Sequence, residues 1–124
     1  MKQNIAHVAI VVNDYDGAID FYTKKLNFML VEDTRLSESK RWVIVAPQGS
    51  EGCSILLAKA ATEEQKTPVG NQTGGRVFLF LHTDSLERDY QQLLNNGVRI
   101  VREPSNEIYG RVAVFADLYC NLWD

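Results

Sequence analysis

The imidazole of His7 is the side chain best suited to chemistry near the start of the chain, and it interrupts an apolar run over residues 5–12. An imidazole can ligate a divalent metal, act as a general base or orient a ligand by a hydrogen bond. A lone histidine on an apolar strand is also often a hydrogen-bonded structural residue, because burying an unpaired polar group costs about 1–3 kcal/mol. These roles stay open, and all lead us to expect a hydrogen-bond partner for His7.

The two cysteines, Cys53 and Cys120, show neither metal-ligand spacing nor a disulfide framework. We expect free thiols in a reducing, cytoplasmic compartment. The chain also lacks a P-loop, a dinucleotide-binding glycine pattern, a nucleophile elbow and zinc-finger spacing. Nucleotide-driven and serine-hydrolase chemistry are therefore not indicated.

The composition is typical of one soluble globular domain, with 124 residues, 45% hydrophobic and 23% charged. A net charge of −3 argues against a nucleic-acid partner, which would need clustered Lys and Arg. The longest apolar run, residues 8–12, is far shorter than the ~20 residues of a membrane span. We therefore expect no membrane partner.

The pattern of secondary-structure elements that would position His7 occurs twice in the sequence. Residues 5–33 and 75–103 each contain an apolar strand, an acidic helix start, an amphipathic helix and a second strand. An offset of seventy positions aligns Asp14 with Asp84. We expect Asp14 to cap the first helix, and Asp84 with Glu87 to form a capping box at the second.

This repeat predicts an α+β fold of two tandem β-α-β-β-β modules, whose sheets form a cup with the helices outside. A single domain over 1–124 would hold module one at about 5–60, a linker at 61–75 and module two at about 76–124. The expected strands cover residues 5–12, 28–31, 41–46 and 54–58, then 77–81, 98–101, 112–115 and 122–124. The last strand stops in mid-pattern, so the chain either ends abruptly or is a fragment.

Two stretches resemble a known family. HVAIVVNDYDGAIDFYTKKLNF, beginning at His7, resembles the signature H-x-x-x-x-V-x-D…A-x-x-F-Y-x-x-x-L-G-F of the vicinal oxygen chelate superfamily. VAVFADLYCNLWD, near the end, resembles its F-x-D-P-D-G-N-x-x-E ending. The superfamily includes glyoxalase I, extradiol dioxygenases, fosfomycin-resistance enzymes and bleomycin-resistance proteins. The resemblance covers the whole chain but does not fix the activity, because one fold serves many chemistries.

The resemblance implies up to four metal ligands: a histidine on the first strand of each module and a carboxylate on the fourth. His7 and Asp124 match two of these positions, whereas Leu56 and Val77 occupy the other two. Leucine and valine have no donor atom, and zinc sites generally have at least three protein ligands. The ligand set is thus incomplete, and any divalent metal ion would be weakly bound.

His82 is an alternative second histidine. Side chains alternate between the faces of a strand, so Val77 and Leu79 should line the cup while His82 points away. A bulge in this strand would reverse that face. His7, His82 and Asp124 would then form a two-His-one-carboxylate triad like that of non-heme iron oxygenases.

Other side chains are possible ligand anchors in hairpins and at strand edges. They can hold a carboxylate or phosphate or stack on a planar ligand, although such groups are more often surface residues. They are Arg41, Trp42, Arg76, Tyr109 and Arg111. Separately, Cys120 stands where the family ending has glycine, so a positive φ is expected there.

Two functions from different classes follow. One is a metal-dependent lyase or dioxygenase of the glyoxalase type, with His7 and Asp124 as metal ligands or as a proton-transfer pair. The other is a metal-free protein that binds, or gives resistance to, a small organic molecule without catalysis. In both, the ligand would contact His7 in a cup lined by Ser54, Leu56, Val77 and Leu79. Apolar concave faces and exposed sheet edges favour a homodimer.

Overall fold

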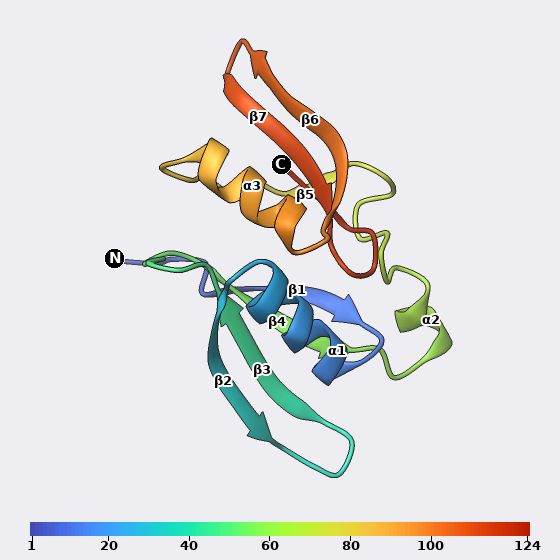
Figure 1. Cartoon of the computed structure of the whole chain (residues 1–124). Coiled ribbons are helices and arrows are strands. Elements are labelled where there is room, and N and C mark those ends of the chain that lie inside the picture. Colours follow the sequence, from blue (N-terminus) through green and yellow to red (C-terminus); the bar gives the residue numbers. More distant parts are fainter.

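The apolar runs form two four-stranded sheets in the computed structural model, which describes residues 1–124 (Figure 1). Sheet one has the order β1-β4-β3-β2, with β1 (His7–Val12), β2 (Met29–Arg35), β3 (Arg41–Ala46) and β4 (Ser54–Lys59). Sheet two has the order β5-β8-β7-β6, with β5 (Val77–Leu79), β6 (Arg99–Glu107), β7 (Gly110–Ala116) and β8 (Leu122–Trp123). In each sheet the first strand runs parallel to the fourth, and the other pairs are antiparallel. The predicted α+β fold of two β-α-β-β-β modules is confirmed.

The helix of module one begins where the sequence predicts. Asp14 caps α1 (Tyr15–Asp20), and its Oδ2 accepts a hydrogen bond from the Gly17 N–H at 2.7 Å. The α-helix passes directly into a π-helical turn, η1 (Phe21–Lys25). Asn27 follows this turn with a φ of 61°, the left-handed conformation that often ends a helix.

The helix of module two, α3 (Leu86–Asn95), has a different cap from the one predicted. The hydroxyl of Ser85 accepts from the Arg88 N–H at 3.3 Å, as an N-cap serine does. Asp84 instead pairs with the Arg88 guanidinium at 2.7 Å, and Glu87 pairs with a guanidinium of β7. The predicted Asp84–Glu87 capping box is therefore wrong.

A third helix lies between the modules. The segment predicted as a linker, residues 61–75, contains α2 (Glu63–Lys66), whose first turn is capped by the hydroxyl of Thr62. No helix in the protein has the length and apolar character needed to cross a membrane.

One hydrophobic cluster joins the two modules, because each module alone is too small to bury a good core. Trp123 of β8 stacks on Phe115 of β7 with ring centroids 5.9 Å apart. The same indole lies 6.0 Å from the ring of Tyr22 and 5.8 Å from that of Phe28, both from module one. Buried aromatic rings contribute large apolar areas, so this contact carries much of the inter-module packing.

A buried hydrogen bond accompanies this packing. The phenol of Tyr22 donates to Asp117 Oδ2 at 2.6 Å. Asp117 also accepts from the backbone N–H groups of Tyr119 and Asn121, at 3.0 and 2.8 Å. Burial, and then the negative charge of Asp117, raise the pKa of Tyr22 well above its usual value. In the same turn Cys120 has a φ of 77°, as predicted from its place at the family's glycine.

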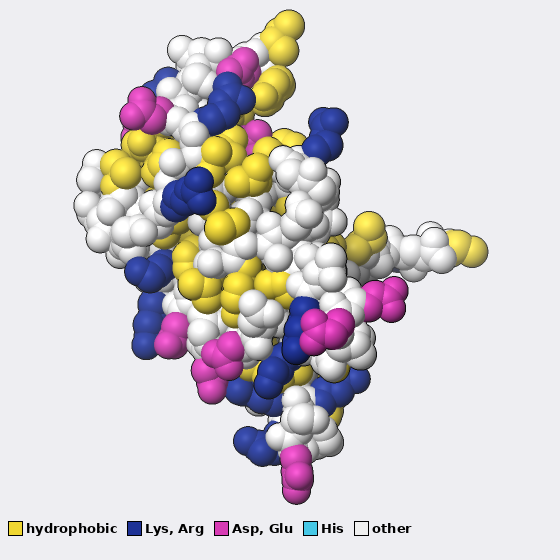
Figure 2. All heavy atoms as spheres, turned by 90° about the vertical axis from the view of Figure 1, so that its right-hand side faces the viewer, with side chains coloured by type: hydrophobic (Ala, Val, Ile, Leu, Met, Phe, Trp, Pro, Cys, Tyr) yellow, Lys and Arg dark blue, Asp and Glu magenta, His cyan; other side chains and the backbone are white.

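Each sheet has one face covered by a helix and one without. α1 packs on β3 and β4, and α3 packs on β6 and β7 (Figure 1). The opposite faces carry no helix, and we call them the helix-free faces. Figure 2, viewed from the right-hand side of Figure 1, shows hydrophobic side chains gathered across the middle of the molecule, with charged side chains mainly around them.

Candidate functional site

The first strand of module two is irregular, and this decides which side chains face the site. Val77 pairs with Leu122, whereas Leu79 pairs with Trp123, and a register shift separates the two pairs. One residue of β5, Phe78, is therefore extra, as in a β-bulge. The bulge puts Leu79 on the core side with Trp123, where it packs against the hydrophobic cluster. The expectation that Leu79 shares the face of Val77 is not met, for this reason.

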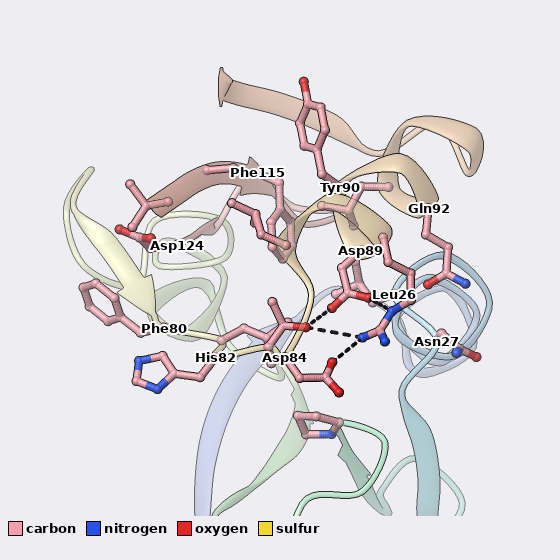
Figure 3. A pocket seen from close by; sticks show the side chains of 18 of the residues that line it. Leu26, Asn27, Phe80, His82, Asp84, Asp89, Tyr90, Gln92, Phe115 and Asp124 are labelled. Atoms are coloured by element: carbon pink, nitrogen blue, oxygen red, sulfur yellow. Dashed lines mark hydrogen bonds and ion pairs between the residues drawn. The ribbon is translucent and has the colours of Figure 1, made fainter. Parts of the chain in front are cut away.

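The bulge brings Phe80 to the helix-free face of sheet two. The Asp124 N–H donates to Leu79 O at 3.0 Å, and the Leu81 N–H donates to Asp124 O at 2.8 Å. In a parallel pair this pattern sets Asp124 beside Phe80, so their side chains share a face. The ring of Phe80 is 65% exposed. Figure 3 shows Phe80 and Asp124 near each other at one side of the pocket.

A cavity of about 480 Å³ lies over this helix-free face. Its volume is in the range of small-molecule sites. Three of the four strands of sheet two and the adjoining residues supply its lining. The lining residues are Arg76, Val77, Phe80, Arg102, Tyr109, Val114 and Asp124. We call this cavity the sheet-two cavity.

The charged groups of the sheet-two cavity are unevenly paired. The guanidinium of Arg76 has no hydrogen-bond or ion-pair partner. Arg102 forms an ion pair with Glu107 at 3.2 Å, and Glu107 does not line the cavity. The carboxylate of Asp124 makes no ion pair. The cavity therefore holds one unpaired cation and one unpaired anion.

A larger cleft of about 990 Å³ continues from this cavity, and the two share Phe80, Asp124 and the tip residue Tyr109. It runs past α3 to the β3–β4 hairpin of module one at residues 47–49. Its polar wall is already satisfied, because Arg88 binds Asp84 at 2.7 Å and a neighbouring carboxylate at 3.0 Å (Figure 3). These hydrogen bonds also lower the pKa of Asp84. Arg88 and its two carboxylate partners are thus engaged with one another, and the cleft shares the unpaired carboxylate of Asp124 with the sheet-two cavity.

His7 lies on the helix-free face of sheet one, in the other module. Its Nδ1 is 2.7 Å from the Ser54 hydroxyl, which in turn donates to the Ala6 carbonyl at 3.3 Å. The imidazole also meets Trp42 edge-on, with ring centroids 6.0 Å apart. Leu56 shares this face, since it lies two residues after Ser54 on β4. His7 has the partner expected of it, but that partner is Ser54, and Asp124 makes no hydrogen bond with His7.

The donor groups of one chain do not fit a resident divalent metal ion. No group of three or more His, Cys, Asp or Glu side chains lies close enough together to hold one. The bulge required to turn His82 toward the site is present, and Figure 3 shows His82 beside Phe80. His7 nevertheless sits on sheet one, so His7, His82 and Asp124 do not assemble into a triad.

Two of the proposed ligand anchors are engaged in ion pairs instead. Arg41 binds Asp33 at 2.6 Å and Asp16 at 2.9 Å, and the first of these contacts lowers the pKa of Asp33. Arg111 binds Glu87 at 3.0 Å. These arginines tie strands to helices within their own modules.

Phe80, Arg102 and Val114 line the sheet-two cavity but were not predicted. Phe80 reaches the cavity only through the bulge, which has no signature in the sequence. Arg102 pairs with Val114 across the β6–β7 hairpin, and cross-strand partners share a face. Counting back from the hairpin turn could have grouped these two, had the register shift between Arg102 and Ser105 been known.

Comparison with known proteins places these features in a family. A family model described as the Glyoxalase/Bleomycin resistance protein/Dioxygenase superfamily matches residues 4–124. An uncharacterized protein of Shewanella frigidimarina (strain NCIMB 400) is 59% identical, covering 100% of this chain and 93% of the relative. The crystal structure of UcmS2 is 30% identical with a TM-score of 0.86, covering 99% of this chain and 96% of that one. The crystal structure of TnmS3, an antibiotic binding protein from Streptomyces sp. CB03234, is 30% identical with a TM-score of 0.80, covering 98% and 93%. This chain belongs to the Glyoxalase/Bleomycin resistance protein/Dioxygenase superfamily.

Proposed function

We propose that this protein binds a planar, largely apolar small organic molecule in the sheet-two cavity and does not convert it chemically. The observation that carries the proposal is the pair of aromatic rings at this cavity, Phe80 and Tyr109, which are 65% and 68% exposed. Large apolar groups exposed together around a hollow are typical of ligand sites. A flat ligand would stack on these rings and bury their apolar surface.

The family comparison supports binding as the function. TnmS3, whose chain aligns with nearly all of this one, is named as an antibiotic binding protein. A ligand with more than one ring system would fill the sheet-two cavity and extend past Phe80 into the larger cleft.

The separation of polar groups supports binding rather than catalysis. A general base acts when it lies within hydrogen-bond reach of the proton it removes, and an acid–base pair must act on one substrate. His7 is held by Ser54 on sheet one, whereas Asp124 faces the sheet-two cavity. The metal-dependent alternative would need a donor set that one chain does not bring together.

We infer a homodimer in which the helix-free face of sheet one from one copy covers that of sheet two from the other. Both faces lack a helix, and β2 exposes Met29, Leu30 and Val31, by 39%, 44% and 57%. Apolar sheet faces and edges of this kind are normally covered. The partner's sheet would close the cavity and add the His7–Ser54 pair as a second polar contact to the ligand. Sedimentation equilibrium should give twice 14.0 kDa. A species of 14.0 kDa at micromolar concentration would contradict the dimer.

The binding proposal is tested with methyl 2-naphthoate, a flat neutral probe, by isothermal titration calorimetry on the full chain. We expect saturable binding, and a loss of affinity of about tenfold on Phe80→Ala, because a stacked ring contributes about 1 kcal/mol or more. Leu118→Ala is the matched control, since Leu118 is a 47% exposed hydrophobic residue outside both cavities. No saturable binding, or equal affinity in wild type and Phe80→Ala, would overturn the proposed function.

A further inference from the structure

We propose that the sheet-two cavity selects planar aromatic anions, and that Arg76 is the residue which recognises the negative group. This inference rests on the proposed function, because it names the class of ligand taken by that same site. Its basis is the distribution of charge around the cavity, compared with the rest of the chain.

The first observation is that Arg76 alone among the arginines singled out from the sequence has a free guanidinium. Arg41 and Arg111 each bind one or more carboxylates within 3.0 Å. Arg76 contributes only its backbone carbonyl, which accepts from the Thr73 hydroxyl. A guanidinium has five donors in a planar fork that matches a carboxylate, a sulfonate or a phosphate. At the cavity this fork is available to a ligand.

The second observation is that a second cation faces the first across the sheet. The strand order β5-β8-β7-β6 puts Arg76, which precedes β5, and Arg102, on β6, at opposite edges of the cavity. Three strand spacings, roughly 14 Å, separate those edges, and both side chains are long enough to lean inward over the middle strands. Val114 on β7 provides an apolar floor between them. A flat acid lying on this floor meets the free guanidinium of Arg76 at one edge, whereas Arg102 at the other edge is paired with Glu107.

The third observation is the placement of the two unpaired charges of the lining. Arg102 is neutralised by its ion pair with Glu107, so the guanidinium of Arg76 and the carboxylate of Asp124 are the charges left for a ligand. Asp124 lies beside Phe80, further along β5 from Arg76, so it accepts a hydrogen bond from a hydroxyl or amino group of the ligand while Arg76 holds the acid.

The experiment compares 2-naphthoate with its neutral methyl ester and with naphthylmethylammonium on the full chain at low ionic strength. We expect 2-naphthoate to bind about fivefold more tightly than the ester, and the ammonium to bind most weakly, as for a partly exposed charge pair. This advantage should shrink as salt is added, because exposed charges are screened.

Two substitutions of opposite sign sharpen the test. Arg76→Gln should remove most of the acid's advantage and leave the affinity for the ester within about twofold, because the rings still stack. Asp124→Asn should raise the affinity for 2-naphthoate, because it removes a like charge from the cavity. The matched control is Arg99→Gln, since Arg99 is an exposed arginine of β6 outside the cavity and without an ion pair.

The outcomes separate the two proposals. Equal affinity for acid and ester in the wild type would overturn the selectivity for anions while leaving the binding function intact. The same loss of acid affinity in Arg99→Gln as in Arg76→Gln would overturn the assignment to Arg76. No saturable binding of any of the three probes would overturn the proposed function itself, and this inference with it.

Discussion

The strands and the helix of module one pair and pack more extensively than those of module two, although both modules follow the same β-α-β-β-β plan. β1 pairs with β4 through six consecutive residues without a register shift. The corresponding strands of module two, β5 and β8, pair through only two positions with a shift between them. The helix of module one buries four side chains, those of Tyr15, Ala18, Phe21 and Tyr22, and α3 buries none. The more loosely fitted module is the one that holds the cavity.

The difference traces to single residues in two places. From His7 to the helix cap at Asp14 is seven positions, but from Val77 to the cap at Ser85 is eight, and β5 takes up the extra residue as a bulge. From Asp14 to Asn27 is thirteen positions, but from Ser85 to Gly97 is twelve. Module one takes up its extra residue in the π turn of η1, since a π-helix has more residues per turn. Over the whole strand–helix unit the two one-residue differences cancel. Between them, corresponding positions of the two modules are offset by one residue, so their side chains point to different faces.

The largest loss of stability should come from removing the indole of Trp123, which packs module two against module one. Trp123→Ala should lower the free energy of unfolding by about 3–5 kcal/mol, because Trp123 is 2% exposed and contacts rings of both modules. Urea unfolding followed by circular dichroism measures it. Trp42→Ala, at a half-buried tryptophan on the helix-free face of sheet one, is the control and should cost less. Equal losses would show that Trp123 is not the main inter-module contact.

The sequence predicted most of the fold, because its periodic patterns are local. The strand at 41–46 was predicted to the residue, and the cap at Asp14 and the left-handed Asn27 are also as predicted. Each depends on a few neighbouring side chains. The site depends instead on the register of β5 against β8, which lie more than forty residues apart. If side chains alternated strictly between the two faces of β5, Leu79 would line the cavity and Phe80 would lie in the core. The bulge reverses both positions.

This reversal can be tested directly with neighbouring substitutions. Leu79→Ala should lower the free energy of unfolding by about 1–3 kcal/mol, less than for a fully buried leucine, because Leu79 is half-buried against the core. Phe80→Ala should change it by less than about 0.5 kcal/mol, because that ring is mainly exposed. Chemical denaturation of both variants provides the comparison. If Phe80→Ala is the more destabilising, β5 alternates regularly and the bulge is absent.

The polar contact between the modules should contribute less than the aromatic one. Tyr22→Phe removes the hydrogen bond to Asp117 and should cost about 1–2 kcal/mol, near the lower end of the range for a bond to a charged acceptor. Asp117 keeps its bonds to the Asn121 amide and to backbone N–H groups, which limits the loss. Urea denaturation near neutral pH measures this difference. A loss as large as that of Trp123→Ala would make the polar contact, rather than ring packing, the main link.

The same tyrosine predicts a pH dependence at the alkaline end. Burial raises the pKa of Tyr22 in the folded state above its ordinary value of 10.0, so its contribution is fully present below pH 10. Above that pH the unfolded chain loses the proton while the folded one keeps it, and stability falls by up to ~1.4 kcal/mol per pH unit from this group. The wild type should therefore lose stability more steeply than Tyr22→Phe as the pH rises above 10. Parallel slopes would show that Tyr22 titrates normally.

The smallest effect on stability is expected at His7, the residue that the sequence alone indicates as the main candidate for chemistry. His7 is exposed, and its contacts are Ser54 at 2.7 Å and the edge of Trp42, so His7→Ala should change the free energy of unfolding by less than about 0.5 kcal/mol. Its effect on the affinity for methyl 2-naphthoate should be smaller than that of Phe80→Ala, because Phe80 lines the sheet-two cavity and His7 reaches a ligand only from the partner copy in the proposed dimer. Calorimetric titration of the two variants side by side decides this order. A larger loss of affinity from His7→Ala would move the main contact from module two to module one, and would mean that the openness of module two is not what makes the binding site.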